Sequence, residues 1–373
     1  MNISKLSISN ITCKRYTNNI TPAREVLPQT AKEEAKIRAN LAKTEKRYQK
    51  IEYLMRVIAN RFMDLFETKK QKELTKNISE IKPESSDTYL LQSEVISRIF
   101  CKDKVIDVNI EDRILEKAAQ NGNSHIFIMN HSNQRRDPSM LAVVSTLLSK
   151  AYRQEGKANN FPIPKIILNQ DILKTMNPIK RKAFEACGAV GIDASIFCAD
   201  KKVNAQALFP VIKDFIKDKV NIFIFPEGKL SVFKDVEFDN RFQIGIAELI
   251  NKALNIKKEI KVIPLGFAYG KGKNKLTGIQ IGDPVIFKRN GDSTTSTSGS
   301  ILKSEFGKDA FKSFFEKHKN ETDVVITENG VPVKSDDAPA FIKGILAENL
   351  DICSKEAERR IQTPFSPDEV LTV

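Results

Sequence analysis

The sequence has no tryptophan and only five cysteines in 373 residues. The cysteines are odd in number and lack metal-type spacing, which argues against a disulfide framework and favours reduced thiols in the cytosol. No apolar run reaches the roughly 18 residues that a membrane-spanning helix needs, and no early apolar segment resembles a signal peptide. Basic residues precede the first acidic residue, Glu25. This is typical of an ordinary basic N-terminus and leaves organellar, plastid-like targeting open.

Negative charge is in short supply, because 60 lysines and arginines outnumber 47 aspartates and glutamates, giving a formal net charge of +13. This excess favours an anionic partner, with an ordinary basic surface as the alternative. No RNP-type aromatic motif or paired Cys/His finger is present, so we expect no nucleic acid partner. We expect a cytoplasmic protein that binds peripherally to the anionic inner face of a membrane. The candidate contacts are a basic amphipathic pattern at 48–66, which could instead pack on the core, and an aromatic cluster at 306–315.

Short apolar runs alternate with helix-like segments through the middle of the chain. The apolar runs lie at 126–130, 165–168, 188–192, 221–225, 261–268 and 279–287, and the helix-like segments at 138–152, 171–186, 204–219 and 241–254. Strands that alternate with helices are typical of an α/β fold. We therefore expect an α/β core over 121–290, with a largely parallel central sheet flanked by helices.

The regions on either side of this core differ from it in composition. We expect residues 1–30 to be extended and 31–120 to form an N-terminal helical region, with two helical patterns in 89–120. Residues 291–373 are expected to hold a linker, a helix and a C-terminal tail. The linker is expected at 289–300, because "RNGDSTTSTSGS" has the composition of a flexible connection. The helix is expected at 301–319.

The segment "MNHSNQRRDPSM", residues 129–140, places His131 after an apolar run and Asp137 before a proline. A structural explanation is available, because Asp137 and Pro138 suit the start of a helix. The functional interpretation is that Asp137 accepts the ring N–H of His131, which leaves the other ring nitrogen free to take a proton from a hydroxyl. In that case the ring should lie about 2.6–3.2 Å from the carboxylate.

A second distinctive segment is "IFIFPEGKLS", residues 222–231. An apolar run ends at Phe225, and Gly228 allows a tight turn. Glu227 and Lys229 are then either functional groups at a strand end or a solvated charge pair. Two weaker segments are "KAFEACGAVGIDAS" at 182–195 and "VIPLGFAYG" at 262–270. Pro264, inside the second of these, predicts an edge strand or a bulge.

In this order the segments resemble the conserved blocks of the glycerolipid acyltransferase superfamily. The first block matches Asn130, His131, Asp137 and Pro138, and the third matches Phe225–Ser231. The resemblance covers roughly 121–290 and implies transfer of a fatty acyl group from an acyl-CoA or acyl carrier protein thioester to a hydroxyl. The acceptor would be glycerol-3-phosphate or 1-acylglycerol-3-phosphate (lysophosphatidate), in phospholipid synthesis. It implies no metal and no cofactor beyond the acyl donor, with His131 as general base and Asp137 as its orienter.

The sequence departs from the family pattern at two places that matter. The first block has one residue too many between His131 and Asp137, so we expect the loop 132–136 to arch outward. Leu230 replaces the arginine of the third block, so other cations must hold a phosphorylated acceptor. The substrate-binding residues that we expect are Glu227, Gly228, Lys229, Arg135, Arg136, Lys180, Arg181 and Lys182. The alternative is a catalytically inactive, membrane-associated protein with the same fold.

Overall fold

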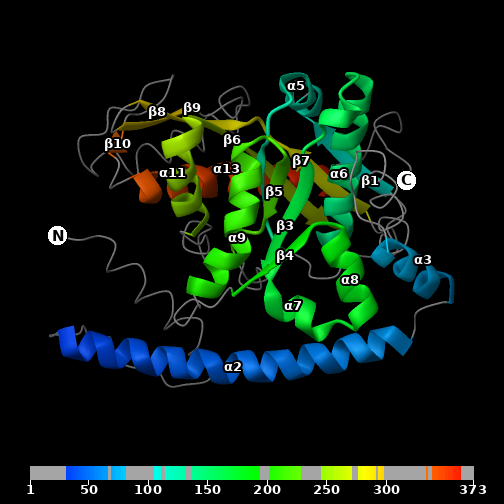
Figure 1. Ribbon diagram of the computed structural model, residues 1–373, viewed down its shortest axis with the longest axis vertical. Helices are drawn as coiled ribbons and strands as arrows, with labels where there is room; N and C mark the ends of the chain where they lie inside the picture. Colours follow the sequence, from blue (N-terminus) through cyan, green and yellow to red (C-terminus); the bar gives the residue numbers. More distant parts are fainter. Residues whose placement is uncertain are drawn as a thin grey trace.

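The computed structural model describes residues 31–65, 69–80, 105–110, 114–131, 137–193, 201–227, 245–270, 276–290, 293–297, 333–334 and 338–362. It confirms the expected α/β fold, in which helices flank a mixed sheet with a parallel centre (Figure 1). No helix within these ranges is both long and apolar enough to cross a bilayer. The expected extended segment at 1–30 and the expected helix at 301–319 lie outside the described residues.

Five parallel strands form the centre of the sheet. In spatial order they are β6 (Glu259–Tyr269), β2 (Ile126–Met129), β5 (Val220–Ile224), β3 (Ile163–Asn169) and β4 (Ala189–Ile192). On its other side, β6 pairs antiparallel with β8 (Val285–Asn290) and with β7 (Leu276–Ile281). Beyond β7 lies β1 (Val105–Ile110), and beyond β8 lie β9 (Ser293–Thr297) and β10 (Val333–Lys334).

Helices cover both faces of the sheet, and the alternation of side chains along β2 separates the two cores. Phe127 and Met129 pack in one core with α5 (Ile114–Asn121) and α6 (Asp137–Gln154). Ile126 and Ile128 pack in the other with α9 (Lys201–Ile216), α11 (Gly245–Lys257) and α13 (Ala338–Gln362). All four residues of β2 are buried, as expected for a parallel strand covered on both faces.

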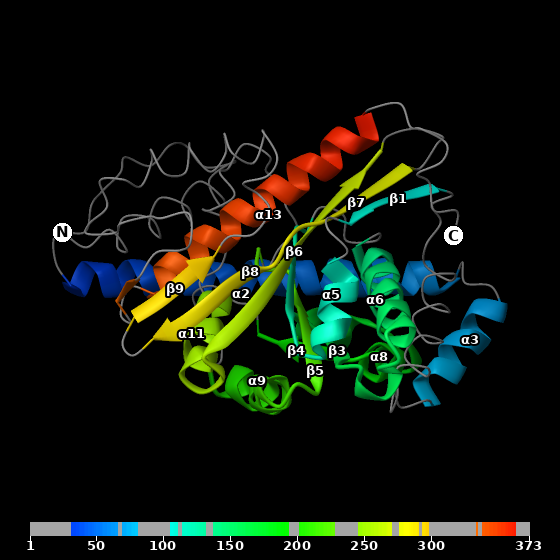
Figure 2. The same cartoon turned by 90° about the horizontal axis from the view of Figure 1, so that it is seen from above.

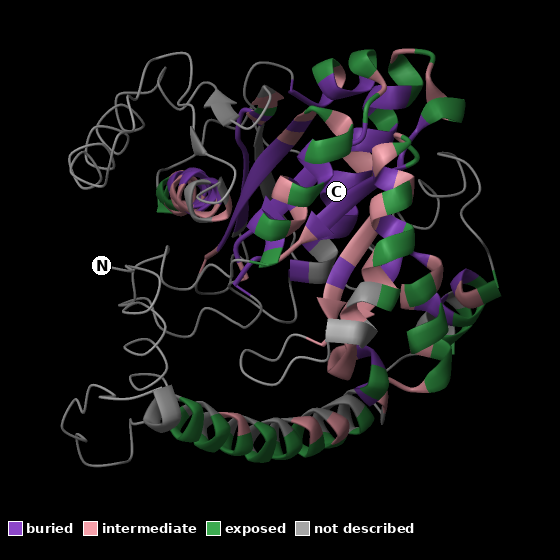
Figure 3. Ribbon diagram, turned by 60° about the vertical axis from the view of Figure 1, so that its left-hand side comes forward, coloured by how far each residue is buried: buried purple, intermediate pink, exposed green. Residues whose placement is uncertain are grey.

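The remaining helices lie mostly beyond the carboxyl ends of the parallel strands. After β3 come α7 (Gln170–Thr175) and α8 (Pro178–Ala186), and the short η2 (Ala158–Asn160) precedes β3. The long α2 (Ala31–Leu65) runs beneath α7 and α8, and α3 (Lys69–Glu80) contacts α8 (Figure 1). In Figure 3 the buried residues gather in the sheet, whereas the described residues of α2 are mostly exposed.

Several expected elements are divided. The helix expected at 171–186 is two helices, because Pro178 begins α8 and the Asn177 side chain accepts the N–H of Lys180 as its cap. The apolar run at 279–287 is likewise two strands, β7 and β8. Pro264 lies opposite their junction, in a central strand and not at an edge. The ladder is broken there, since the partner of β6 changes from β8 to β7 and Gly282 donates to the Pro264 carbonyl at 3.0 Å.

Three expectations about the flanking regions are wrong. Residues 105–110, expected to be helical, form β1 and pair with β7, because their alternating apolar residues suit a strand. Within the expected linker, 293–297 form β9; serine and threonine suggested flexibility, but threonine also favours strands. The expected tail contains α13, whose apolar residues Ile342, Leu346 and Leu350 are fully buried at helical spacing.

Glycines in the sheet let α13 lie directly against the strands (Figure 2). A Cβ atom on Gly266 of β6 would lie 2.0 Å from the carbonyl oxygen of Cys353. A Cβ atom on Gly278 of β7 would lie 2.8 Å from the carbonyl oxygen of Ala357. Because both contacts are with helix backbone, a methyl group at either position requires the helix to move.

Gly266→Ala should therefore lower the free energy of unfolding by at least about 2 kcal/mol, through overpacking between β6 and α13. Urea denaturation followed by circular dichroism measures this change. Gly245→Ala is the matched control, since a Cβ atom at Gly245 would meet nothing within 4 Å. Equal stability of the two variants would contradict the close packing of α13.

His125 is buried at the amino end of β2, with 2% of its surface exposed. Burial, and secondarily the positive charge of Lys261, lowers the pKa of His125 from 6.5 to about 4. The unfolded chain takes up this proton near pH 6.5, as an ordinary histidine does. The folded protein takes it up only near pH 4, so acid favours the unfolded state between these values.

The contribution of His125 to the free energy of unfolding should thus be complete above about pH 6.5 and lost as the pH falls to about 4. Its size is on the order of 3 kcal/mol, since one pKa unit corresponds to about 1.4 kcal/mol. Denaturant titrations across this range should give a shallower pH dependence for His125→Gln than for the wild type. An unchanged slope in the variant would show that another group dominates acid unfolding.

Candidate active site

Three neighbouring parallel strands, β5, β2 and β6, end at the same edge of the sheet. A polar side chain lies at or just beyond each end: Glu227 after β5, His131 after β2, and Tyr269 as the last residue of β6. In open α/β sheets, binding sites form beyond the carboxyl ends of the strands. The fold therefore brings these three residues to the edge at which a site is expected.

His131 and Asp137 are in direct contact. The Nδ1 atom of His131 lies 2.6 Å from Oδ2 of Asp137, at the short end of the predicted range. An ionised carboxylate can only accept hydrogen bonds, so Nδ1 carries the proton and Nε2 has a free lone pair. The His131 side chain is 14% exposed, and the centroid of its ring lies 4.7 Å from the centroid of the Phe225 ring. The geometry suits a histidine that takes a proton from a bound group.

Asp137 is fully buried, and several groups offset the cost of burying its carboxylate. Oδ2 meets the His131 ring, and Oδ1 accepts a hydrogen bond from the hydroxyl of Tyr269. Asp137 is also the first residue of α6, where the helix dipole favours negative charge. Asp137 thus begins the helix, as the structural explanation expected, and the same carboxylate also contacts the His131 ring.

Glu227 holds the main chain of His131. Its Oε1 atom accepts the backbone N–H of His131 at 2.9 Å, and only 1% of its surface is exposed. The alternative of a solvated charge pair is therefore wrong for Glu227. Its buried position indicates that it supports His131, whereas the sequence had suggested contact with substrate.

Asn130 fixes the end of β2 against the neighbouring elements. Its Oδ1 accepts the N–H of Phe267 at 2.7 Å, and its Nδ2 donates to the Phe267 carbonyl at 2.9 Å. Nδ2 also lies 3.0 Å from the Ser354 hydroxyl on α13. Because Asn130 is buried and precedes His131 directly, these bonds determine where the backbone of His131 lies.

The structure describes three of the six candidate phosphate-binding cations, Lys180, Arg181 and Lys182, and all three lie on α8. Lys180 pairs with Asp64 of α2 at 2.5 Å. Burial acts to raise the pKa of Asp64, but the hydrogen bonds from the Asn177 side chain and from Lys180, together with the charge of Lys180, lower it. Arg181 and Lys182 are exposed on α8, and Arg181 lies 3.9 Å from Glu185. The other expected ligands, Arg135, Arg136, Gly228 and Lys229, lie outside the described residues, as does the arch expected at 132–136.

Tyr269 and Ser354 were not identified from the sequence as residues of the site. Tyr269 was detectable, because it directly follows the apolar run at 261–268 and the strand-end rule applies to that run as well. Ser354 was not, because nothing in the local sequence indicates that α13 reaches Asn130. Within the described ranges, no group of three His, Cys, Asp or Glu side chains is placed to hold a metal ion.

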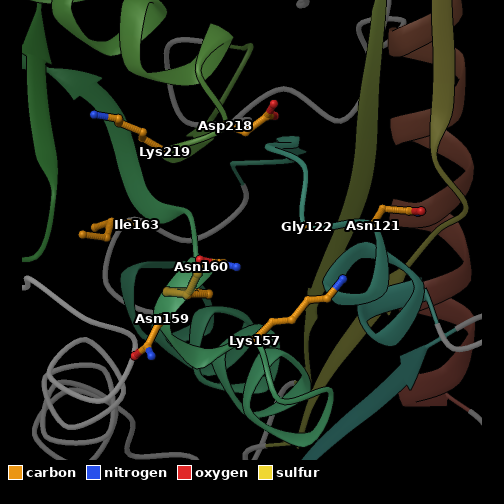
Figure 4. A pocket seen from close by; sticks show the side chains of 9 residues that line it. Asn121, Gly122, Lys157, Asn159, Asn160, Ile163, Asp218 and Lys219 are labelled. Carbon is orange, nitrogen blue, oxygen red and sulfur yellow. The ribbon is translucent and has the colours of Figure 1, made fainter.

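A hollow of about 500 Å³ lies at the opposite edge of the sheet. It is lined by residues that precede the strands, among them Gly122, Lys157, Asn160 and Lys219 (Figure 4). Asp218, also in the lining, pairs with Lys257 of α11. The hollow is thus separated from His131 by the length of β2.

No protein-family model matches the sequence, and no curated protein matches it significantly. The likeness to the acyltransferase superfamily therefore rests on the short motifs quoted above.

The tautomer of His131 can be tested directly. Ring-nitrogen NMR shifts of the wild-type protein should show that the neutral form of the His131 ring carries its proton on Nδ1. Asp137→Asn should move it to Nε2, because an asparagine amide can donate to Nδ1. The protein has three histidines, and the resonances absent from His131→Ala identify the relevant ring. A wild-type ring protonated on Nε2 would contradict the assignment.

Proposed function

We propose that the protein is an O-acyltransferase. It moves a fatty acyl group from an acyl-CoA or acyl carrier protein thioester to a hydroxyl of glycerol-3-phosphate or lysophosphatidate. The observation that carries the proposal is the 2.6 Å contact between His131 Nδ1 and Asp137 Oδ2, with the ring partly exposed at the carboxyl edge of the sheet. The order and type of residues in the two motifs support the same reaction class.

The residues fit a direct transfer between the two substrates. Nε2 of His131 takes the proton of the acceptor hydroxyl as its oxygen attacks the thioester carbonyl carbon. The resulting imidazolium is stabilised by the buried carboxylate of Asp137, which keeps its own position through Tyr269. When the tetrahedral intermediate collapses, the C–S bond breaks and the departing thiolate takes from His131 the proton that came from the acceptor hydroxyl. The products are an ester and a free thiol, so the reaction needs no nucleophilic serine or cysteine.

The test is an assay with radiolabelled acyl-CoA or acyl carrier protein and each acceptor in turn. His131→Ala should reduce kcat by about 10²–10⁴-fold, the usual contribution of a general base. Asp137→Asn should be nearly as severe, because it disturbs the tautomer. Tyr269→Phe should cost less, about tenfold, as one hydrogen bond to a charged group is lost. His125→Gln is the matched control, since it changes a histidine at the opposite end of β2 and should retain activity above pH 7.

Two outcomes would contradict the proposal. Full activity in folded His131→Ala would mean that the dyad is not the base. Absence of transfer with every donor and acceptor would favour the alternative of a catalytically inactive protein with this fold. Circular dichroism of each variant separates lost chemistry from lost structure.

A further inference from the structure

The long helix α2 contacts the rest of the protein on one side, and only over part of its length. It contacts α7, and near its C-terminal end the Asp64 carboxylate accepts from the Asn177 side chain at 3.0 Å and pairs with Lys180 on α8. Tyr53 and Val57 are half-buried, which indicates the side of the helix nearer the protein body. Figures 1 and 3 show α2 spanning the carboxyl edge of the sheet, away from both cores.

The outward side of α2 carries an apolar stripe. Ile51, Leu54, Met55 and Ile58 are 59%, 52%, 63% and 63% exposed. Their spacing of three, four and seven residues places them on one face of a helix. Four large apolar side chains together on one exposed helix face differ from the single apolar residues scattered over any protein surface. The alternative raised from the sequence, that 48–66 packs on the core, is therefore wrong for these four residues.

Basic side chains continue the stripe toward the N-terminus. Lys43, Arg47 and Lys50 are exposed and precede Leu54 at steps of four, three and four residues, so they lie along one line with it. An apolar stripe with lysine and arginine beside it is the pattern of a helix that lies in the surface of a bilayer. The net charge of +13 acts in the same direction.

We propose that this face of α2 binds an anionic lipid bilayer, with the four apolar side chains among the acyl chains and the cations at the headgroups. A second copy of the chain fits less well, because a parallel pairing of the stripes would bring the basic line of each helix close to that of its partner. The stripe is also short, spanning about 10 Å along the helix at 1.5 Å per residue. Insertion into a bilayer needs no matching partner surface.

This placement bears on the substrate. A bilayer beneath α2 lies on the side of the molecule at which β5, β2 and β6 end, so the edge that carries His131 faces the lipid. If the protein is the proposed acyltransferase, this orientation favours an acceptor held in the membrane, of the lysophosphatidate type, over a soluble acceptor. Lipid binding itself does not depend on the reaction.

Flotation of the full chain with vesicles tests the docking. We expect binding to vesicles of phosphatidylcholine with phosphatidylglycerol, weaker binding at high salt, and little binding to phosphatidylcholine alone. Replacing Ile51, Leu54, Met55 and Ile58 by glutamine, a good helix former, should abolish binding and leave the helix intact. The control is Phe209→Gln with Ile256→Gln, which removes two exposed apolar side chains of α9 and α11 that are 70% and 66% exposed.

The electrostatic part has its own matched pair of variants. Lys43→Gln with Lys50→Gln should weaken vesicle binding by at least about tenfold. Lys150→Gln with Lys252→Gln removes the same charge from exposed sites on α6 and α11 and should have little effect.

Three results would overturn the docking proposal, and none depends on acyl transfer. The first is equal binding to neutral and anionic vesicles. The second is wild-type binding by the variant that lacks the stripe. The third is a wild-type dimer by sedimentation that becomes a monomer in this variant without any lipid binding, which would assign the face to a second copy.

Discussion

The site depends on keeping a charged carboxylate out of water. Asp137 is fully buried, and an isolated buried carboxylate would be neutralised or expelled. His131, Tyr269 and the start of α6 together offset that cost, and they come from three separate elements. Removing one of them leaves the others facing an incompletely satisfied charge. This coupling explains why the surroundings of the dyad must be as well ordered as the dyad itself.

Two buried asparagines provide that order by fixing β2 at both ends. At the amino end, Asn221 of β5 accepts the His125 N–H at 2.8 Å and donates to the Pro162 carbonyl at 3.0 Å. At the carboxyl end, Asn130 bonds to Phe267 of β6 and to Ser354 of α13. The four-residue strand between them has little freedom to slip. The glycines of β6 and β7 contribute to the same ordering of β2, because α13 must lie close to the sheet for Ser354 to reach Asn130.

The sequence predicted what depends on local pattern. Apolar runs located the parallel strands, and the strand-end rule brought His131, Asp137 and Glu227 together. It failed where the outcome depends on distant partners. Residues 105–110 pair with β7, which lies far along the chain, and Lys180 pairs with Asp64, 116 residues away. Glu227 was expected to bind substrate, because nothing in its own segment indicates that it accepts the His131 N–H.

The extra residue in the first motif is the most instructive case. A sequence pattern treats the separation of histidine and aspartate as a fixed number, because loop length is all that it can count. In the structure, the strand before His131 is held by β5, β6 and α13, and the helix that begins at Asp137 is held by the core shared with α5. The 2.6 Å contact is therefore determined by two elements placed independently of the connection between them. Lengthening a loop whose ends are already fixed costs little, since the entropy of closure grows only slowly with length. The altered spacing is thus a weak argument against the dyad.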